Sequence, residues 1–199
     1  MFLAESLTDT LPPQIWNEVD ATPGWLAREE AQLLFNLAKQ VTSGCIVEVG
    51  SYRGRSTVAL SHGAKAGHQP PVFAVEPHEE FVGELGGQFG CEDRAAFFQT
   101  MLRTRSYENV RLVNLSSELI TPNWQQPVAM LWLDGDHSFE GVSRDFQCWR
   151  DHLPTGAVIV FDDATDQRLG PYRLIEELIN AGKVRKLAAV GKVLATIKT

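Results

Sequence analysis

Three aspartates and a histidine stand where two predicted strands end, and they are the residues of this sequence best suited to chemistry. Asp134 and His137 follow one apolar run, and Asp162 and Asp163 follow the next. If the two strands are parallel neighbours, their carboxyl ends lie about 5 Å apart, so the carboxylates converge. Convergent carboxylates repel one another unless a proton or a cation lies between them.

These side chains have the chemistry of a site for a hard divalent cation. Oxygen ligands without cysteine favour Mg²⁺, Ca²⁺ or Mn²⁺ over zinc. Such a cation lowers the pKa of an oxygen that it coordinates, and an imidazole can accept a proton near neutral pH. The sequence therefore predicts metal ligands at Asp134, Asp162 and Asp163 and a general base at His137. The alternative for His137 is a residue that only caps its own helix.

A second group of residues predicts a nucleoside site at the same edge of the sheet. In VEVGSYRGRSTVALS, Gly50 and Gly54 bracket a tight turn between a strand and a helix. Glu76 follows the second strand, where a carboxylate can accept both ribose hydroxyls of a nucleoside. The turn lacks the GxGxxG spacing that cradles a diphosphate. Glu48, beside the turn, suits a cationic amino-acid group better than a pyrophosphate.

The elements that must position these residues alternate along the chain. Near-continuous apolar runs indicate parallel strands covered on both faces, and segments with i, i+3, i+4 apolar spacing indicate helices between them. This pattern is typical of an α/β protein. The predicted parallel strands are 45–49, 72–75, 110–113, 128–133 and 157–161. The predicted helices are 27–41, 56–65, 92–104, 139–152 and 170–181.

The C-terminal segment predicts an antiparallel pair. Residues 184–190 and 193–198 flank Gly191-Lys192, a two-residue turn of the kind that joins a hairpin. We therefore expect one domain over residues 1–199, with helices on both faces of a mostly parallel sheet. Residues 1–44 form an N-terminal arm and helix, of which 1–25 are a candidate mobile arm or lid. The loop GELGGQFG (83–90) is expected to be flexible and to border the site.

Composition and charge limit the classes of partner. The net charge of −7 argues against nucleic acid, because phosphate contacts need a basic face. No apolar run approaches the roughly 18 residues that span a bilayer, and the N-terminus lacks a basic n-region, so we expect no membrane partner. The scattered cysteines fit reduced thiols and a cytoplasmic location. Trp16 and Trp25 are candidates for pocket walls or for the interface of a homodimer.

One stretch of the sequence resembles a known family. EVGSYRGRSTVAL is similar to motif I of the class I S-adenosylmethionine-dependent methyltransferases, and its E-x-G-x-x-x-G-x-S form is typical of small O-methyltransferases. The resemblance covers residues 45–163 and implies a Rossmann-like methyltransferase fold with a seven-stranded sheet and a reversed seventh strand. It implies that the cofactor is S-adenosylmethionine, with Ser56 near its methionyl carboxylate. The other residues that it places at the cofactor are Gly50, Tyr52, Gly54, Asp134 and, at the adenine, Ser116 and Ser117.

The acids fit a metal-dependent branch of that family. O-methyltransferases of the catechol type have an acid after the fourth parallel strand and an acid pair after the fifth, where this chain has Asp134, Asp162 and Asp163. They have a lysine three residues beyond the first acid, whereas this chain has His137. DGDHSFEGVSRDFQCW is more similar to the macrolide-sugar O-methyltransferases, in which D-x-x-H is usual. The resemblance implies metal-dependent methylation of a hydroxyl on a small molecule other than a simple catechol.

Three other functions stay open. Asp134 and Asp136 form a DxD metal motif of the glycosyltransferase kind, although that function would leave the glycine turn and Glu76 without a role. A haloacid dehalogenase phosphatase has similar acids but needs its DxD on the first core strand. A domain could also bind S-adenosylmethionine without catalysis. Metal-dependent turnover would distinguish the enzyme from this last alternative.

Overall fold

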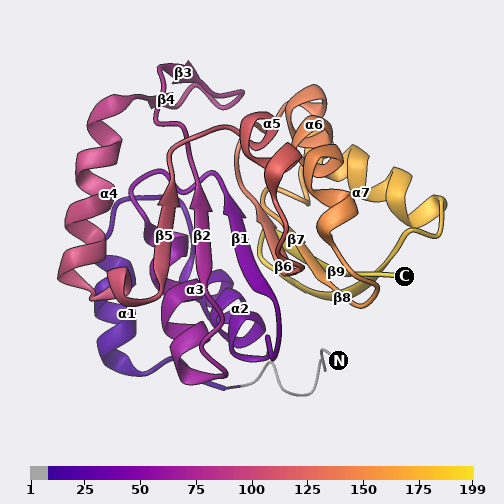
Figure 1. Ribbon diagram of the computed structural model, residues 1–199. Helices are drawn as coiled ribbons and strands as arrows, with labels where there is room; N and C mark the ends of the chain where they lie inside the picture. The colour runs from indigo at the N-terminus through magenta and orange to yellow at the C-terminus, as the bar shows by residue number, and fades with distance from the viewer. Residues whose placement is uncertain (1–8) are drawn as a thin grey trace.

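A seven-stranded sheet forms the centre of the protein, of which the computed structural model describes residues 9–199 (Figure 1). The strand order is β5-β2-β1-β6-β7-β9-β8. Neighbours from β5 to β7 are parallel, while β9 is antiparallel to both β7 and β8. The predicted α/β fold with its C-terminal hairpin is therefore confirmed. The strands are β1 (Cys45–Val49), β2 (Val72–Val75), β5 (Val110–Val113), β6 (Val128–Leu133), β7 (Val158–Phe161), β8 (Val184–Val190) and β9 (Val193–Lys198).

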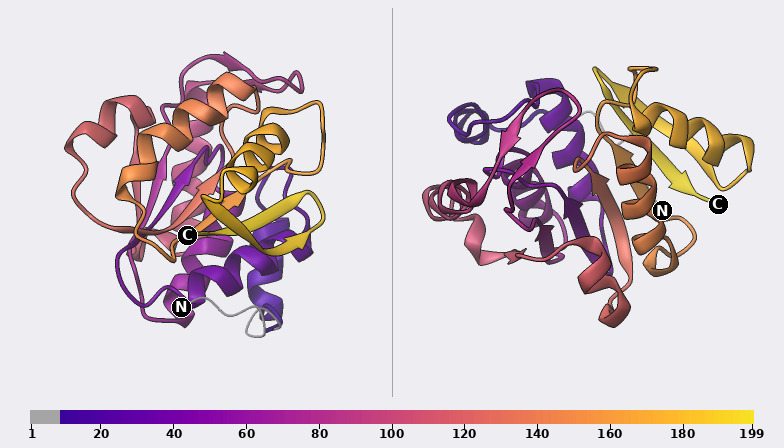
Figure 2. Two further views of the ribbon diagram at one scale, coloured as in Figure 1. Left: turned by 90° about the vertical axis from the view of Figure 1, so that its right-hand side faces the viewer. Right: turned by 90° about the horizontal axis from the view of Figure 1, so that it is seen from above.

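Helices cover both faces of the sheet, as Figure 2 shows from above. Successive residues of a strand point to opposite faces. In β6, Met130 and Trp132 accordingly join the core under α1–α4, and Leu131 and Leu133 join the core under α6 and α7. The helices are α1 (Pro13–Asp20), α2 (Arg28–Lys39), α3 (Arg55–Ala66), α4 (Cys91–Arg103), α5 (Ser117–Ile120), α6 (Phe139–Trp149) and α7 (Gly170–Asn180). Short 3-10 turns lie at Ser106–Glu108, Thr121–Asn123 and Arg150–His152.

Two segments that the sequence analysis treats as flexible have a defined conformation in the structure, and their mobility stays a prediction. The part of the N-terminal arm that the structure describes is folded onto the core: Leu11, Ile15 and Val19 are buried beside α2 and α3. Residues 1–8 of the predicted arm lie outside the described residues. The predicted loop 83–90 also contributes to a small hairpin, formed by β3 (Phe81–Val82) and β4 (Gln88–Phe89). Strands of two residues are too short to leave a periodic signal in the sequence.

The topology determines where a ligand site is expected. β1 lies between β2 and β6. From β1 the strand order runs through β2 to β5 on one side, and the chain then crosses back to β6 on the other side of β1. Ligands of open α/β sheets bind beyond the carboxyl ends of the strands at such a switch point. The β3–β4 hairpin lies above this edge (Figure 1). Among residues 9–199, no helix combines the length and the apolar character needed to cross a bilayer.

Candidate functional site

A cavity of about 870 Å³ opens at the carboxyl ends of β1, β2, β6 and β7. Its volume lies within the roughly 300–1,000 Å³ that is usual for small-molecule sites. Segment 23–26 and the β3–β4 hairpin form its outer wall. As residues 9–199 define it, the lining excludes Glu48 and Gly54. The predicted site residues that do line it are Gly50, Tyr52, Ser56, Glu76, Ser116, Ser117, Asp134, His137, Asp162 and Asp163.

The glycine turn is shaped by two close approaches of the chain. Gly50 has φ +85°, and a Cβ atom there would lie 2.2 Å from the main-chain oxygen of Asp134. The β6 tip therefore passes directly over this residue. Gly54, with φ +92°, is the N-cap residue of α3, and a Cβ atom there would lie 2.9 Å from Met101 Cε in α4. Gly54 thus permits helix packing behind the cavity, and its predicted contact with the cofactor stays a prediction.

Glu76 links the glycine turn to the cavity. Its Oε2 accepts hydrogen bonds from the main-chain nitrogens of Ser51 and Tyr52, both at 3.2 Å, and its Oε1 accepts one from His78 at 3.1 Å. A carboxylate offers about four acceptor positions, so three bonds leave capacity for a ligand hydroxyl. The same side chain therefore supports the turn and faces the space where a ribose is predicted.

Glu48 lies beneath the turn rather than in the cavity wall. Its carboxylate accepts hydrogen bonds from Ser56 Oγ and from Thr57 Oγ1, the latter at 2.6 Å, which ties β1 to the start of α3. Burial raises the pKa of Glu48 to about 8, although the two hydroxyls oppose the shift. These contacts place Glu48 behind Ser56. Its predicted contact with a cationic amino group stays a prediction.

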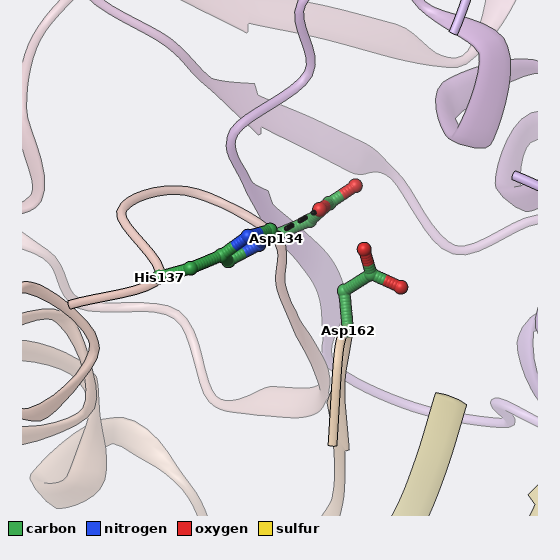
Figure 3. A group of neighbouring side chains, drawn as sticks. All are labelled: Asp134, His137 and Asp162. Atoms are coloured by element: carbon green, nitrogen blue, oxygen red, sulfur yellow. Dashed lines mark ion pairs between the residues drawn. The ribbon is translucent and has the colours of Figure 1, made fainter. Parts of the chain in front are cut away.

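The predicted carboxylate cluster comes together at the tips of β6 and β7 (Figure 3). Asp134, His137 and Asp162 each offer one ligand atom, and these three atoms lie within 4.8 Å of one another. Asp163 adjoins the group, because its Oδ2 lies 3.2 Å from His137 Nδ1. On the other side of the ring, Nε2 lies 3.4 Å from Asp134 Oδ1. The imidazole is therefore held between two carboxylates.

The charges of the cluster fit a site for a cation. Burial raises the pKa of Asp162, and the charge of Asp134 raises it further. Burial lowers the pKa of His137, but Asp134 and Asp163 outweigh that effect and raise it overall. Asp162 Oδ1 is buried and has no hydrogen-bond partner among the described residues. The unpaired Asp162 Oδ1, with Asp134 and an imidazole beside it, belongs to a donor set that suits a hard divalent cation.

Lys192 is a residue of the acidic cluster that the sequence prediction missed. Its Nζ lies 2.6 Å from Asp162 Oδ2 and 3.4 Å from Asp163 Oδ2. In the sequence it is only the second residue of a predicted hairpin turn. It reaches the acids because β9 pairs with β7, which brings the turn to the end of β7. No local spacing could have revealed this contact.

The residues around His137 explain why its ring faces the acids. Ser138, rather than His137, caps α6, since its Oγ accepts a hydrogen bond from the Gly141 nitrogen at 2.9 Å. Asp136 accepts hydrogen bonds from the nitrogen and hydroxyl of Ser138, at 2.9 and 3.0 Å. The capping interpretation of His137 is therefore wrong. Both carboxylate oxygens of Asp136 are thus engaged by Ser138, which counts against a glycosyltransferase DxD site.

The two serines after β5 differ in their surroundings. Ser117 Oγ accepts a hydrogen bond from Trp149 Nε1 at 3.1 Å, so this hydroxyl satisfies the indole nitrogen of a buried residue of α6. Ser116 precedes α5 and makes no capping hydrogen bond with its side chain. Of the two tryptophans, Trp25 lines the cavity and is 66% exposed, whereas Trp16 packs against the core of α1–α4.

Comparison with known proteins identifies the family of the chain. A family model described as a methyltransferase domain matches residues 47–164, which is more than half of the chain. Among solved structures, an O-methyltransferase from Bacillus cereus in complex with SAH has a TM-score of 0.71 at 18% identity, covering 98% of this chain and 94% of that one.

Two further structures show the same fold. The SAH-bound methyltransferase PaMTH1 from Podospora anserina has a TM-score of 0.69 at 13% identity, with 98% of this chain and 91% of that one covered. The O-methyltransferase TomG from Streptomyces achromogenes, in complex with SAM, has a TM-score of 0.65 at 18% identity, with 98% and 90% covered. The chain therefore belongs to the methyltransferase-domain family and has the fold of these SAM- and SAH-bound methyltransferases.

Proposed function

We propose that this methyltransferase transfers a methyl group to a hydroxyl of a small molecule and depends on a divalent cation. The observation that carries the proposal is one cavity with two different ends. One end has the glycine turn and Glu76, which suit a nucleoside. The other end has His137 among three carboxylates, which suits the activation of a hydroxyl.

The cofactor end would hold S-adenosylmethionine through residues that line the cavity. Glu76 would accept the ribose hydroxyls, and Ser116 and Ser117 would lie at the adenine. The start of α3 at Ser56 would hold the methionyl carboxylate, because a helix N-terminus favours an anion. When bound, the cofactor supplies an activated methyl group on a sulfonium.

The acidic end would hold Mg²⁺ or a similar cation through Asp134, Asp162 and Asp163. When bound, such a cation lowers the pKa of a hydroxyl that it coordinates. His137 would accept the hydroxyl proton at Nε2, the ring nitrogen that faces Asp134. Asp163 would orient the ring, since its Oδ2 faces Nδ1 at 3.2 Å.

The outer wall of the cavity supports an acceptor without negative charge. Trp25 stacks on Tyr52 with ring centroids 5.3 Å apart, and Phe89 meets Tyr52 edge-on at 5.4 Å. These rings offer apolar contact to a planar acceptor. Three acids of the same wall would repel phosphate or carboxylate groups, namely Glu79, Glu80 and Glu84. We further propose a cytoplasmic location, because the three cysteines of the described chain are free.

Calorimetry and a transfer assay together test this proposal. S-adenosylmethionine should bind to the purified protein, and added Mg²⁺ should permit transfer of a labelled methyl group to a panel of uncharged phenols and sugar-bearing compounds. Chelation by EDTA should stop the transfer and leave most of the cofactor affinity. Cofactor binding with no effect of Mg²⁺ and no turnover would favour the alternative of a binding domain without catalysis.

A further inference from the structure

Lys192 occupies the space between the acids that the proposed cation would share. Its ammonium contacts Asp162 Oδ2 at 2.6 Å and Asp163 Oδ2 at 3.4 Å. Asp162 is 3% exposed and the Lys192 side chain 27%, so this ion pair is partly shielded from water. A shielded pair is screened much less by salt than a surface pair. The lysine is thus the counter-charge of the cluster in this structure.

The main chain around Lys192 directs it toward the acids. Its nitrogen donates to Glu30 Oε1 at 3.0 Å, and its carbonyl oxygen accepts from the Ala164 nitrogen at 2.8 Å. Glu30 is buried, and its other oxygen accepts from the Ala27 nitrogen at the start of α2. The turn is therefore fastened to α2 on one side and to the loop after β7 on the other. The two anchors fix the main-chain position from which the Lys192 side chain reaches the acids.

Asp162 keeps one acceptor atom that Lys192 does not use. Lys192 contacts Oδ2, whereas Oδ1 is buried without a partner among residues 9–199. Oδ1 therefore remains as a ligand atom on the same carboxylate. An ammonium and a divalent cation on one carboxylate would lie a few ångströms apart and repel each other.

We propose that Lys192 is an intramolecular competitor of the divalent cation. Its ammonium neutralises Asp162 and Asp163 in the metal-free protein and must withdraw from Asp162 when a cation binds, so Lys192 sets the metal affinity of the site. This inference rests on the metal site of the proposed function, but it does not depend on methyl transfer.

Titration of Mn²⁺, followed by the electron paramagnetic resonance of the free ion, tests the inference. Lys192→Met should bind Mn²⁺ roughly tenfold or more tightly than the wild-type protein, as expected when a like charge a few ångströms away is removed. Lys192→Arg keeps the charge and should stay near the wild-type affinity. Lys186→Met is the matched control, because Lys186 is an exposed lysine of the same hairpin whose nearest acid, Glu176, lies 3.9 Å away.

Equal or weaker Mn²⁺ binding by Lys192→Met would overturn the inference, and so would an equal gain in Lys192→Arg. A second measurement uses the wild-type protein and so avoids any folding defect of the variants. Acylation of lysines, read by mass spectrometry, should be slower at Lys192 than at Lys186, and Mg²⁺ should accelerate it at Lys192 alone. Unchanged acylation at saturating Mg²⁺ would contradict displacement.

The outcomes separate this inference from the proposed function. Tighter Mn²⁺ binding by Lys192→Met without methyl transfer to any acceptor of the panel would keep the inference and count against the proposed acceptor class. Absence of Mn²⁺ binding in every variant would reject both the metal site and the inference. In that case, S-adenosylmethionine binding by the same protein would show that the cofactor end of the cavity is folded and that only the metal site is rejected.

Discussion

Replacement of Glu76 by alanine should affect both cofactor binding and the stability of the glycine turn. The side chain accepts three main-chain hydrogen bonds, from Ser51, Tyr52 and His78, and it faces the predicted ribose position. Loss of a charged hydrogen-bond partner should weaken S-adenosylmethionine binding by about 1–3 kcal/mol, which is roughly a 5- to 150-fold rise in Kd. The free energy of unfolding should also fall, because three main-chain nitrogens lose their acceptor. Glu76 is half-buried, so water can hydrogen-bond to some of these nitrogens, and the loss should stay at about 1–3 kcal/mol.

The variant Glu76→Gln separates the two effects. Its amide oxygen can accept from Ser51 and Tyr52, but its NH₂ group then faces the His78 nitrogen, which is also a donor. Glutamine should therefore keep more of the stability than alanine while losing the charge that favours the ribose hydroxyls. Isothermal titration calorimetry gives the affinity of each variant, and urea unfolding gives its stability. Wild-type affinity in a folded Glu76→Ala protein would refute the assignment of Glu76 to the ribose.

Three further predictions concern the base, the buried acid and the glycine turn. His137→Ala should lower kcat roughly 10²- to 10⁴-fold while cofactor affinity stays near wild type, and an unchanged kcat would exclude it as the base. Because the folded pKa of Glu48 lies above its unfolded value, at about 8, its contribution to stability is present at low pH and is lost as pH rises from about 4.5 through 8. Between about pH 4.5 and 8, the free energy of unfolding of Glu48→Gln should therefore fall less steeply with pH than that of the wild type, by up to about 1.4 kcal/mol per pH unit. Urea unfolding at several pH values measures both slopes, and equal slopes would contradict the prediction. Gly50→Ala should lower the melting temperature far more than the control Gly156→Ala. Both have positive φ, but only the Cβ at Gly50 meets backbone, 2.2 Å from the Asp134 oxygen, while none of the described atoms lies within 4 Å at Gly156.

The sequence by itself determined the sheet and the edge at which the site lies. Strands covered on both faces must be apolar at nearly every position, so β1, β6 and β7 stand out as short apolar runs. Polar residues directly after such runs must lie at the carboxyl edge. Asp134 and Asp162 were therefore predicted to converge, and they do. The glycine turn could also be predicted from the sequence, because it depends only on the spacing of Gly50 and Gly54 within one short segment.

Which side chains actually meet at that edge was decided by the tertiary structure. Lys192 reaches Asp162 from 30 positions away only because β9 pairs with β7. Glu48 was assigned to the cavity from its position beside the turn, whereas the packing of α3 on β1 gives it two hydroxyl partners below the cavity wall. Local periodicity reports which face of an element is buried, but not which distant residue covers it. Contacts of that kind depend on strand order and helix packing, which exist only once the whole chain has folded.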